Sequence, residues 1–149
     1  MSEDDLHNLL ALAVEDVLET MFFSESLGPC QPDAGAAELQ ARVAFTGETF
    51  GVVAVRISPA SARSLTASFL GESEDLLNDI QIAHVVCELT NMLCGCIASK
   101  MASRGCFDLS SPELIGESDT RPTDCIEVQH SFAIEHGTLT VSLFSSVSA

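Results

Sequence analysis

The stretch from Leu76 to Met101 limits the possible folds of this chain more than any other feature of its sequence. Apolar residues recur there every three or four positions, which predicts one long helix. Ile, Val, Leu, Ala, Met and Cys cover most of its circumference, so most of that surface has to pack on the rest of the domain. One ridge of polar residues runs along the same helix and needs a separate explanation.

The rest of the chain combines helix patterns with strand patterns of period two. The predicted elements are, in order, a helix from Ser2 to Phe23, a hairpin of Leu39–Phe45 with Phe50–Ile57, a short helix from Ser58 to Gly71, the long helix, and a hairpin of Cys125–Ile134 with Thr138–Phe144. Hairpins that are separate from helices are typical of α+β domains. We therefore expect one domain over residues 1–149, an antiparallel sheet built from hairpins with two long helices packed on one face.

The charge balance argues against several classes of partner. The chain has 22 acidic and 6 basic residues and a formal net charge of −16, which repels nucleic acid and anionic lipid surfaces. Its acidic start lacks the apolar centre of a signal peptide, and no apolar run approaches the length of a membrane span. We expect a cytoplasmic protein that neither binds nucleic acid nor inserts into a membrane. Its six cysteines are expected to be mainly buried thiols rather than disulfides.

The polar ridge on the long helix consists of Gln81, His84, Glu88, Asn91 and Gly95. Spacings of three and four positions place these residues on one face of the helix. An ionised Glu88 inside the domain would carry a large desolvation penalty unless it were paired. We therefore expect the ridge to face water or a partner.

Gly95 is a position on this ridge without a side chain. A glycine inside a helix costs about 1 kcal/mol relative to alanine, so its presence calls for a reason of access or packing. Two explanations remain open. Either another protein approaches closely beside Asn91, or the glycine allows a kink or tight packing within the domain.

Glu88 and Asn91 project side by side because they lie three positions apart on a helix. A carboxylate can pair with a cation such as a lysine ammonium, and a carboxamide both donates and accepts hydrogen bonds, which suits it to orienting one water molecule. The spacing alone is typical of an ordinary solvated helix face. Whether the pair forms a functional site therefore has to be judged from the surrounding sequence.

The segments around this pair resemble the CheC/CheX/FliY family of chemotaxis phosphatases, and CheX-type members in particular. The resemblance spans nearly the whole chain and rests on ELTNMLCG in the long helix, VAFTGETFGVVAVRIS and SARSLTASFLGE before it, and SSPELIGES after it. The family motif has an Asp or Ser four residues before the Glu, then the Asn, and a proline a little over twenty residues later. Glu88 and Asn91 match this motif and Pro112 lies close to the expected proline, but His84 replaces the Asp or Ser. The first helix has no Asn three residues after Glu15 or Glu19, so a single site is implied.

The resemblance implies an enzyme, a phosphatase that hydrolyses the aspartyl phosphate of a CheY-like response regulator. Glu88 would pair with the regulator's active-site lysine, Asn91 would orient the attacking water, and His84 and Gly95 would contact the partner. The chain would need no cofactor of its own, because in this family Mg²⁺ is bound by the regulator. Such catalysis depends on positioning and charge neutralisation rather than on a protein nucleophile.

CheX-like proteins also pair through a continuous sheet, which implies a homodimer. Alternating strands such as QARVAF and the last hairpin are expected to leave an edge for this pairing.

Two other interpretations compete with a phosphatase. The same docking surface would serve a non-catalytic CheX-like module that binds a response regulator or a flagellar or signalling component. Alternatively, Cys87, Cys94, Cys96 and His84 would hold a metal ion. Ligands at i and i+2 point to different sides of a helix, however, and the sequence has no second CxxC pair, so we predict no metal site.

Overall fold

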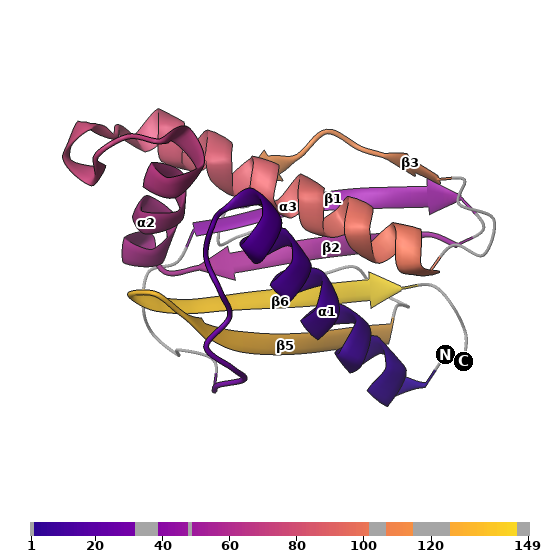
Figure 1. Cartoon of the computed structure of the whole chain (residues 1–149). Helices are drawn as coiled ribbons and strands as arrows, with labels where there is room; N and C mark the ends of the chain where they lie inside the picture. The colour runs from indigo at the N-terminus through magenta and orange to yellow at the C-terminus, as the bar shows by residue number, and fades with distance from the viewer. Residues whose placement is uncertain (1, 32–38, 48, 102–106, 115–125, 146–149) are drawn as a thin grey trace.

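The computed structural model describes residues 2–31, 39–47, 49–101, 107–114 and 126–145. Its helices are α1 (Glu3–Met21), α2 (Pro59–Leu70), the 3-10 turn η1 (Glu74–Leu76) and α3 (Asp79–Met101). Its strands are β1 (Leu39–Gly47), β2 (Gly51–Ile57), β3 (Phe107–Leu109), β4 (Glu113–Leu114), β5 (Ile126–Ile134) and β6 (Gly137–Ser145). The strands form one antiparallel sheet in the order β3-β1-β2-β6-β5, and β4 also pairs with β1. Figure 1 shows α1 and α3 crossing the same face of this sheet, which confirms the predicted α+β architecture.

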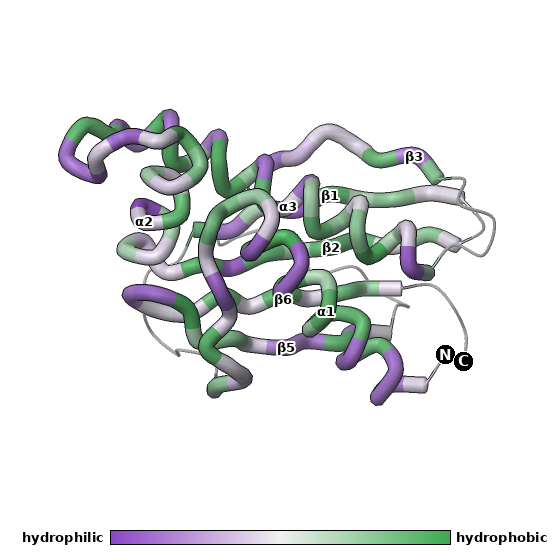
Figure 2. Tube along the Cα trace, in the orientation of Figure 1, coloured by the Kyte–Doolittle hydropathy of each residue, from purple (hydrophilic) through white to green (hydrophobic). Residues whose placement is uncertain are grey.

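α1 begins directly after Ser2, the residue at which the first helix is predicted to start. The Asp5 N–H donates to Ser2 Oγ at 3.2 Å and the Ser2 N–H donates to Asp5 Oδ2 at 3.1 Å, so the two residues form a capping box. Phe22 follows the helix in a fully buried position and stacks on Phe69 of α2, with ring centroids 5.1 Å apart. Hydrophobic and hydrophilic positions alternate around the turns of both α1 and α3 (Figure 2). The apolar side of each helix lies in one core shared with the sheet.

α3 begins at Asp79, so the predicted start at Leu76 is wrong by three residues. The Asn78 N–H donates to Gln81 Oε1 at 2.9 Å, and the Gln81 N–H donates to Asn78 Oδ1 at 2.8 Å. This reciprocal cap fixes the first turn, while Leu77 before it is extended and buried. Leu76 and Leu77 fit a helical period, but the cap decides where the helix starts. It also engages Gln81 within the chain, so the outward ridge begins at His84.

The apolar surface of α3 packs on β1, β2, α1 and α2. Its buried residues are Ile82, Val85, Val86, Leu89, Thr90, Leu93, Cys94, Ile97 and Ala98. By length and mean hydropathy α3 is the one described helix that could cross a membrane, contrary to the expectation that no segment qualifies. Because its apolar side belongs to the hydrophobic core, α3 has the character of a core helix of a soluble protein.

β1 is an interior strand, so the expectation that QARVAF leaves a free edge is wrong. β2 pairs with one side of β1, and the two short strands β3 and β4 pair with the other. We call residues Phe107–Leu114, which contain both short strands, the β3–β4 strap.

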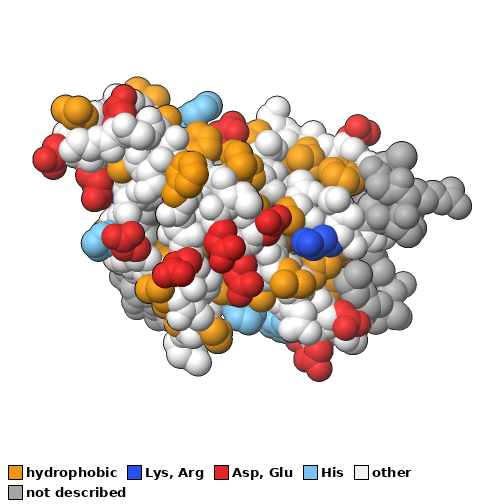
Figure 3. Space-filling view, in the orientation of Figure 1, with side chains coloured by type: hydrophobic (Ala, Val, Ile, Leu, Met, Phe, Trp, Pro, Cys, Tyr) orange, Lys and Arg blue, Asp and Glu red, His pale blue; other side chains and the backbone are white. Residues whose placement is uncertain are grey.

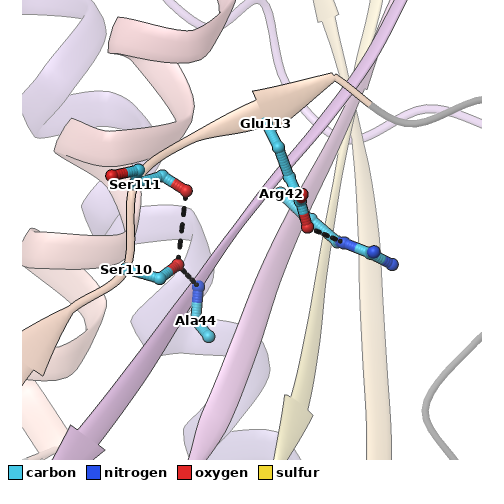
Figure 4. Close-up of polar contacts among 5 residues, drawn as sticks. All are labelled: Arg42, Ala44, Ser110, Ser111 and Glu113. Atoms are coloured by element: carbon cyan, nitrogen blue, oxygen red, sulfur yellow. Dashed lines mark hydrogen bonds and ion pairs between the residues drawn. The ribbon is translucent and has the colours of Figure 1, made fainter.

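Polar contacts hold the strap on β1 (Figure 4). The Ser110 N–H donates to the Ala44 carbonyl oxygen at 2.9 Å, and the Ala44 N–H donates to Ser110 Oγ at 2.9 Å. Near the other end of the strap, Arg42 Nε donates to Glu113 Oε1 at 2.7 Å. Pro112 lies half-buried between the two short strands. The strap therefore runs along the sheet edge that lies beside α3.

The last hairpin forms as predicted. β5 and β6 pair from Ile126↔Ser145 to Ile134↔Gly137, and Glu135 and His136 make the turn. β5 is the outer strand at this end of the sheet, and part of its edge is covered by the segment 27–30. There the Leu27 N–H donates to the Ala133 carbonyl oxygen at 2.7 Å and the Cys30 N–H donates to the Ser131 carbonyl oxygen at 3.0 Å.

Candidate functional site

The predicted site lies on the side of α3 that is turned away from the core. His84 is exposed, and Glu88, Asn91 and Gly95 are half-buried. The buried residues of α3 occupy the opposite side of the helix. Glu88 and Asn91 are therefore accessible from outside, yet neighbouring groups restrict the space around them.

The two polar side chains have no partner within the described part of the chain. Neither the Glu88 carboxylate nor the Asn91 carboxamide makes a hydrogen bond or an ion pair with another described residue. Burial, and secondarily the charge of Glu88, raises the pKa of the neighbouring Cys87 thiol. The Glu88 carboxylate and the Asn91 carboxamide thus keep their hydrogen-bonding capacity for an incoming molecule.

The surroundings of Gly95 bear on one of the two explanations for this glycine, a kink or tight packing within the domain. A Cβ atom built at Gly95 would have Leu109 Cδ1 of the strap as its nearest neighbour, at 3.8 Å. This is an ordinary van der Waals distance, so an alanine would fit among the described residues. α3 also continues without a break from Asp79 to Met101. The described residues therefore give no packing reason for a glycine beside Asn91.

Acidic residues of α1 lie beside α3. Glu15, Asp16 and Glu19 are exposed, and Asp16 Oδ2 lies 4.0 Å from Cys96 Sγ of α3, which places the acidic side of α1 against the neighbouring helix. Figure 3 shows acidic side chains gathered at the centre of this face of the molecule. A molecule that docks on the ridge and extends over α1 would meet these acidic side chains. Spacing within one helix indicates nothing about this flank, because α1 and α3 are far apart in sequence.

The cysteines of α3 point in different directions. Cys94 Sγ lies 3.7 Å from the Val43 carbonyl oxygen in the core, where burial raises the pKa of its thiol to about 12, whereas Cys96 Sγ faces Asp16. Cys87, Cys94 and Cys96 are free thiols, while Cys106 and Cys125 lie outside the described residues. Within the described residues, no three or more His, Cys, Asp or Glu side chains are arranged to hold a metal ion. His130 and His136 lie in β5 and in the last turn.

Comparison with known families gives one match. The family described as chemotaxis phosphatase CheX matches residues 39–134, which is more than half of the chain and includes the whole of α3. A search of curated proteins finds no match.

Solved structures with the same fold come from several bacteria. A chemotaxis protein CheX from Desulfovibrio desulfuricans is 25% identical, with a TM-score of 0.74, over 93% of this chain and 97% of that one. A putative chemotaxis protein from Desulfovibrio vulgaris Hildenborough is 26% identical, with a TM-score of 0.74, over 95% of this chain and 96% of that one. CheX in a CheX-CheY-BeF3-Mg²⁺ complex from Borrelia burgdorferi has a TM-score of 0.76 at 17% identity, over 96% of this chain and 99% of that one, a similarity that concerns the fold alone.

Proposed function

This chain belongs to the CheX family of chemotaxis phosphatases, and from that premise we propose that it hydrolyses the aspartyl phosphate of a CheY-like response regulator. The observation that carries the proposal is the position of Glu88 and Asn91. They lie one helical turn apart on the outward side of α3, half-buried and without hydrogen-bond partners among the described residues. The Borrelia burgdorferi structure, in which CheX is bound to CheY with BeF3 and Mg²⁺, supports the choice of partner.

Glu88 has the role of a docking charge in this proposal. Its carboxylate pairs with the ammonium group of the regulator's active-site lysine when α3 covers the phosphorylation site. Displacement of water from the contact strengthens that ion pair, because the effective dielectric constant falls. The carboxylate has no ion pair to break within the described part of the chain, so docking does not sacrifice a contact of the folded protein.

Asn91 has the role of positioning the nucleophile. Its carboxamide oxygen accepts a hydrogen bond from one water molecule and holds that water in line with the bond between phosphorus and the aspartyl oxygen. The water oxygen then forms a bond to phosphorus, the bond to the aspartyl oxygen breaks, and the regulator's aspartate leaves as a carboxylate. The proton of the water passes to the phosphate that is released. Phosphoryl transfer of this kind requires alignment and charge neutralisation, and Mg²⁺ is supplied by the regulator.

His84 and Gly95 bound the pair along the helix and are proposed to contact the partner. The helix rises about 16 Å from His84 to Gly95, at 1.5 Å per residue. This length is enough for a surface contact with a partner protein. At Gly95 the regulator backbone approaches α3 closely because no side chain intervenes. We further propose that the protein acts in the cytoplasm as a homodimer.

One observation favours the non-catalytic alternative. His84 is exposed and occupies the motif position at which the resemblance implies an Asp or Ser. A panel of the host's CheY-like regulators, each labelled as the acyl phosphate with Mg²⁺ present, separates the two functions. We expect this chain to accelerate phosphate release from at least one regulator well beyond its own rate of decay. Binding to the phosphorylated form of a regulator without faster release would instead establish an adaptor.

A further inference from the structure

Two large apolar side chains are exposed where α3 begins. Ile80 is 81% exposed and Leu76 is 72% exposed. Ile80 lies four residues before His84 and eight before Glu88, which places it on the same side of the helix and about 12 Å from Glu88 along the axis. A molecule that covers the ridge from His84 to Gly95 is therefore in position to cover Ile80 as well.

The fold does not account for this exposure. Leu77, between Leu76 and the helix, is buried and supplies the apolar anchor of the loop. The first turn of α3 is fixed by the Asn78 and Gln81 cap, to which neither Leu76 nor Ile80 contributes a side chain. β-branched residues such as isoleucine are also weaker helix formers than Lys, Glu or Gln at an exposed site. An interaction outside the described chain would explain both positions.

Charges around the two side chains define the chemistry of that interaction. Glu72, Glu74, Asp75 and Asp79 are all exposed in the same loop and first turn. Figure 3 shows hydrophobic and acidic side chains interspersed at the upper left, over the connection between α2 and α3. A complementary surface is apolar at its centre and basic at its rim.

We propose that Leu76 and Ile80 form a second contact for the same response regulator and raise its affinity, on a regulator surface that is apolar and ringed by Lys or Arg. This inference rests on the proposed function, because it assigns the regulator as the occupant. The contact is remote from the phosphoryl group and is made equally in the ground state and the transition state. It therefore lowers KM without changing kcat.

The test uses the full chain and the regulator that the phosphatase panel identifies. A variant with both Leu76→Ala and Ile80→Ala is compared with the control variant Leu27→Ala. Leu27 is also an exposed leucine, but it lies beside β5, at the sheet edge opposite the strap. We expect the double variant to raise KM, and the Kd for the beryllofluoride-activated regulator, by about tenfold or more, with kcat and Tm unchanged. The Leu27→Ala variant should match the wild type in all four quantities.

Two different results would separate the failure of this inference from the failure of the proposed function. An active wild-type chain whose KM and Kd are the same in the double variant would overturn the second contact alone. No acceleration by the wild-type chain with any regulator would remove the proposed phosphatase and, with it, this extension.

Discussion

Gly95 is the residue of the site whose presence the fold explains least. A methyl group at this position would have room beside Leu109 Cδ1, and an alanine inside a helix is about 1 kcal/mol more favourable than a glycine. We predict that Gly95→Ala raises the free energy of unfolding by up to about 1 kcal/mol while it lowers phosphatase activity, because the methyl group obstructs the partner. Urea unfolding and acyl-phosphate hydrolysis measure the two effects.

Gly71→Ala provides the control for the unfolding measurement. Space is open around Gly71 too, but its φ of 68° is strained for residues with a side chain, so this substitution should destabilise the fold. A Gly95→Ala variant that is less stable than the wild type would indicate that the glycine serves the fold after all.

Glu88 and Asn91 are expected to affect different kinetic constants. Glu88→Gln keeps the shape of the side chain and removes its charge, so the ion pair with the regulator's lysine is lost. We predict that KM rises about tenfold or more, as for the loss of a charge-assisted contact, while kcat changes less. Steady-state kinetics against the phosphorylated regulator would contradict this role if the Gln variant lost kcat at an unchanged KM.

The sequence predicts this pair because one helix carries both residues, and helical spacing determines which side chains share a face. Helical spacing also places Gln81 on the ridge. Its side chain, however, completes the cap with Asn78 and is engaged within the chain. The neighbours of Gly95 and Cys96 on the same helix depend on the tertiary structure. Leu109 of the strap would be next to a side chain at position 95, and Asp16 of α1 lies beside Cys96; no local pattern indicates either neighbour.

The length of a helix or strand determines whether the sequence can predict it, because a period can be counted only over several residues. α1, α2, α3 and both hairpins have enough residues for a period to be counted, and the structure contains all of them. β3 has three residues and β4 has two, too few to show alternation. These short strands nonetheless cover the edge of β1, which is why the expected free edge at QARVAF is absent.

α1 contacts β5 through a pair of histidines, and this contact is predicted to depend on pH. His7 Nδ1 lies 3.4 Å from His130 Nδ1. Burial, and secondarily the charge of His7, lowers the pKa of His130. Because the unfolded chain binds this proton at a higher pH than the folded chain does, the free energy of unfolding should fall as pH drops below about 6.5.

Thermal unfolding between about pH 7.5 and about pH 5 measures this effect, since carboxylates titrate mainly below that range. The His7→Gln variant removes the second cause of the pKa shift and should show a shallower decrease in Tm over the same interval. An equal decrease in the wild type and in His7→Gln would exclude the histidine pair as a source of the pH dependence.

For the whole molecule, the arrangement of the sheet separates the proposed dimer contact from the proposed site. α3 lies over β1 and β2, whereas β5 is at the far end of the strand order. A homodimer that pairs through β5 would therefore leave the ridge of each copy accessible. The net charge of −16 favours a basic partner surface for that ridge and opposes non-specific association between copies.

The homodimer can be tested at a single backbone group of β5. Ser131 and Ala133 direct their backbone groups to the outer edge, toward residues 27–30, and alternation directs those of Gln129 to the same edge. Gln129→Pro removes an N–H that a second copy would need and that the β5–β6 ladder does not use. We predict a dimer for the wild type and a monomer of unchanged Tm for this variant, by size exclusion with light scattering. A wild-type monomer at micromolar concentration would contradict the homodimer.

In the proposed mechanism, the outward carboxamide on α3 positions the water that hydrolyses the regulator's aspartyl phosphate. The most direct measurement is the decay of the phosphorylated regulator in the presence of wild type and of Asn91→Ala at equal concentration, with binding to the beryllofluoride-activated regulator measured in parallel. We predict that Asn91→Ala lowers kcat by about 100-fold or more while its affinity and Tm stay close to those of the wild type. Equally fast decay with wild type and Asn91→Ala would show that Asn91 does not position the attacking water.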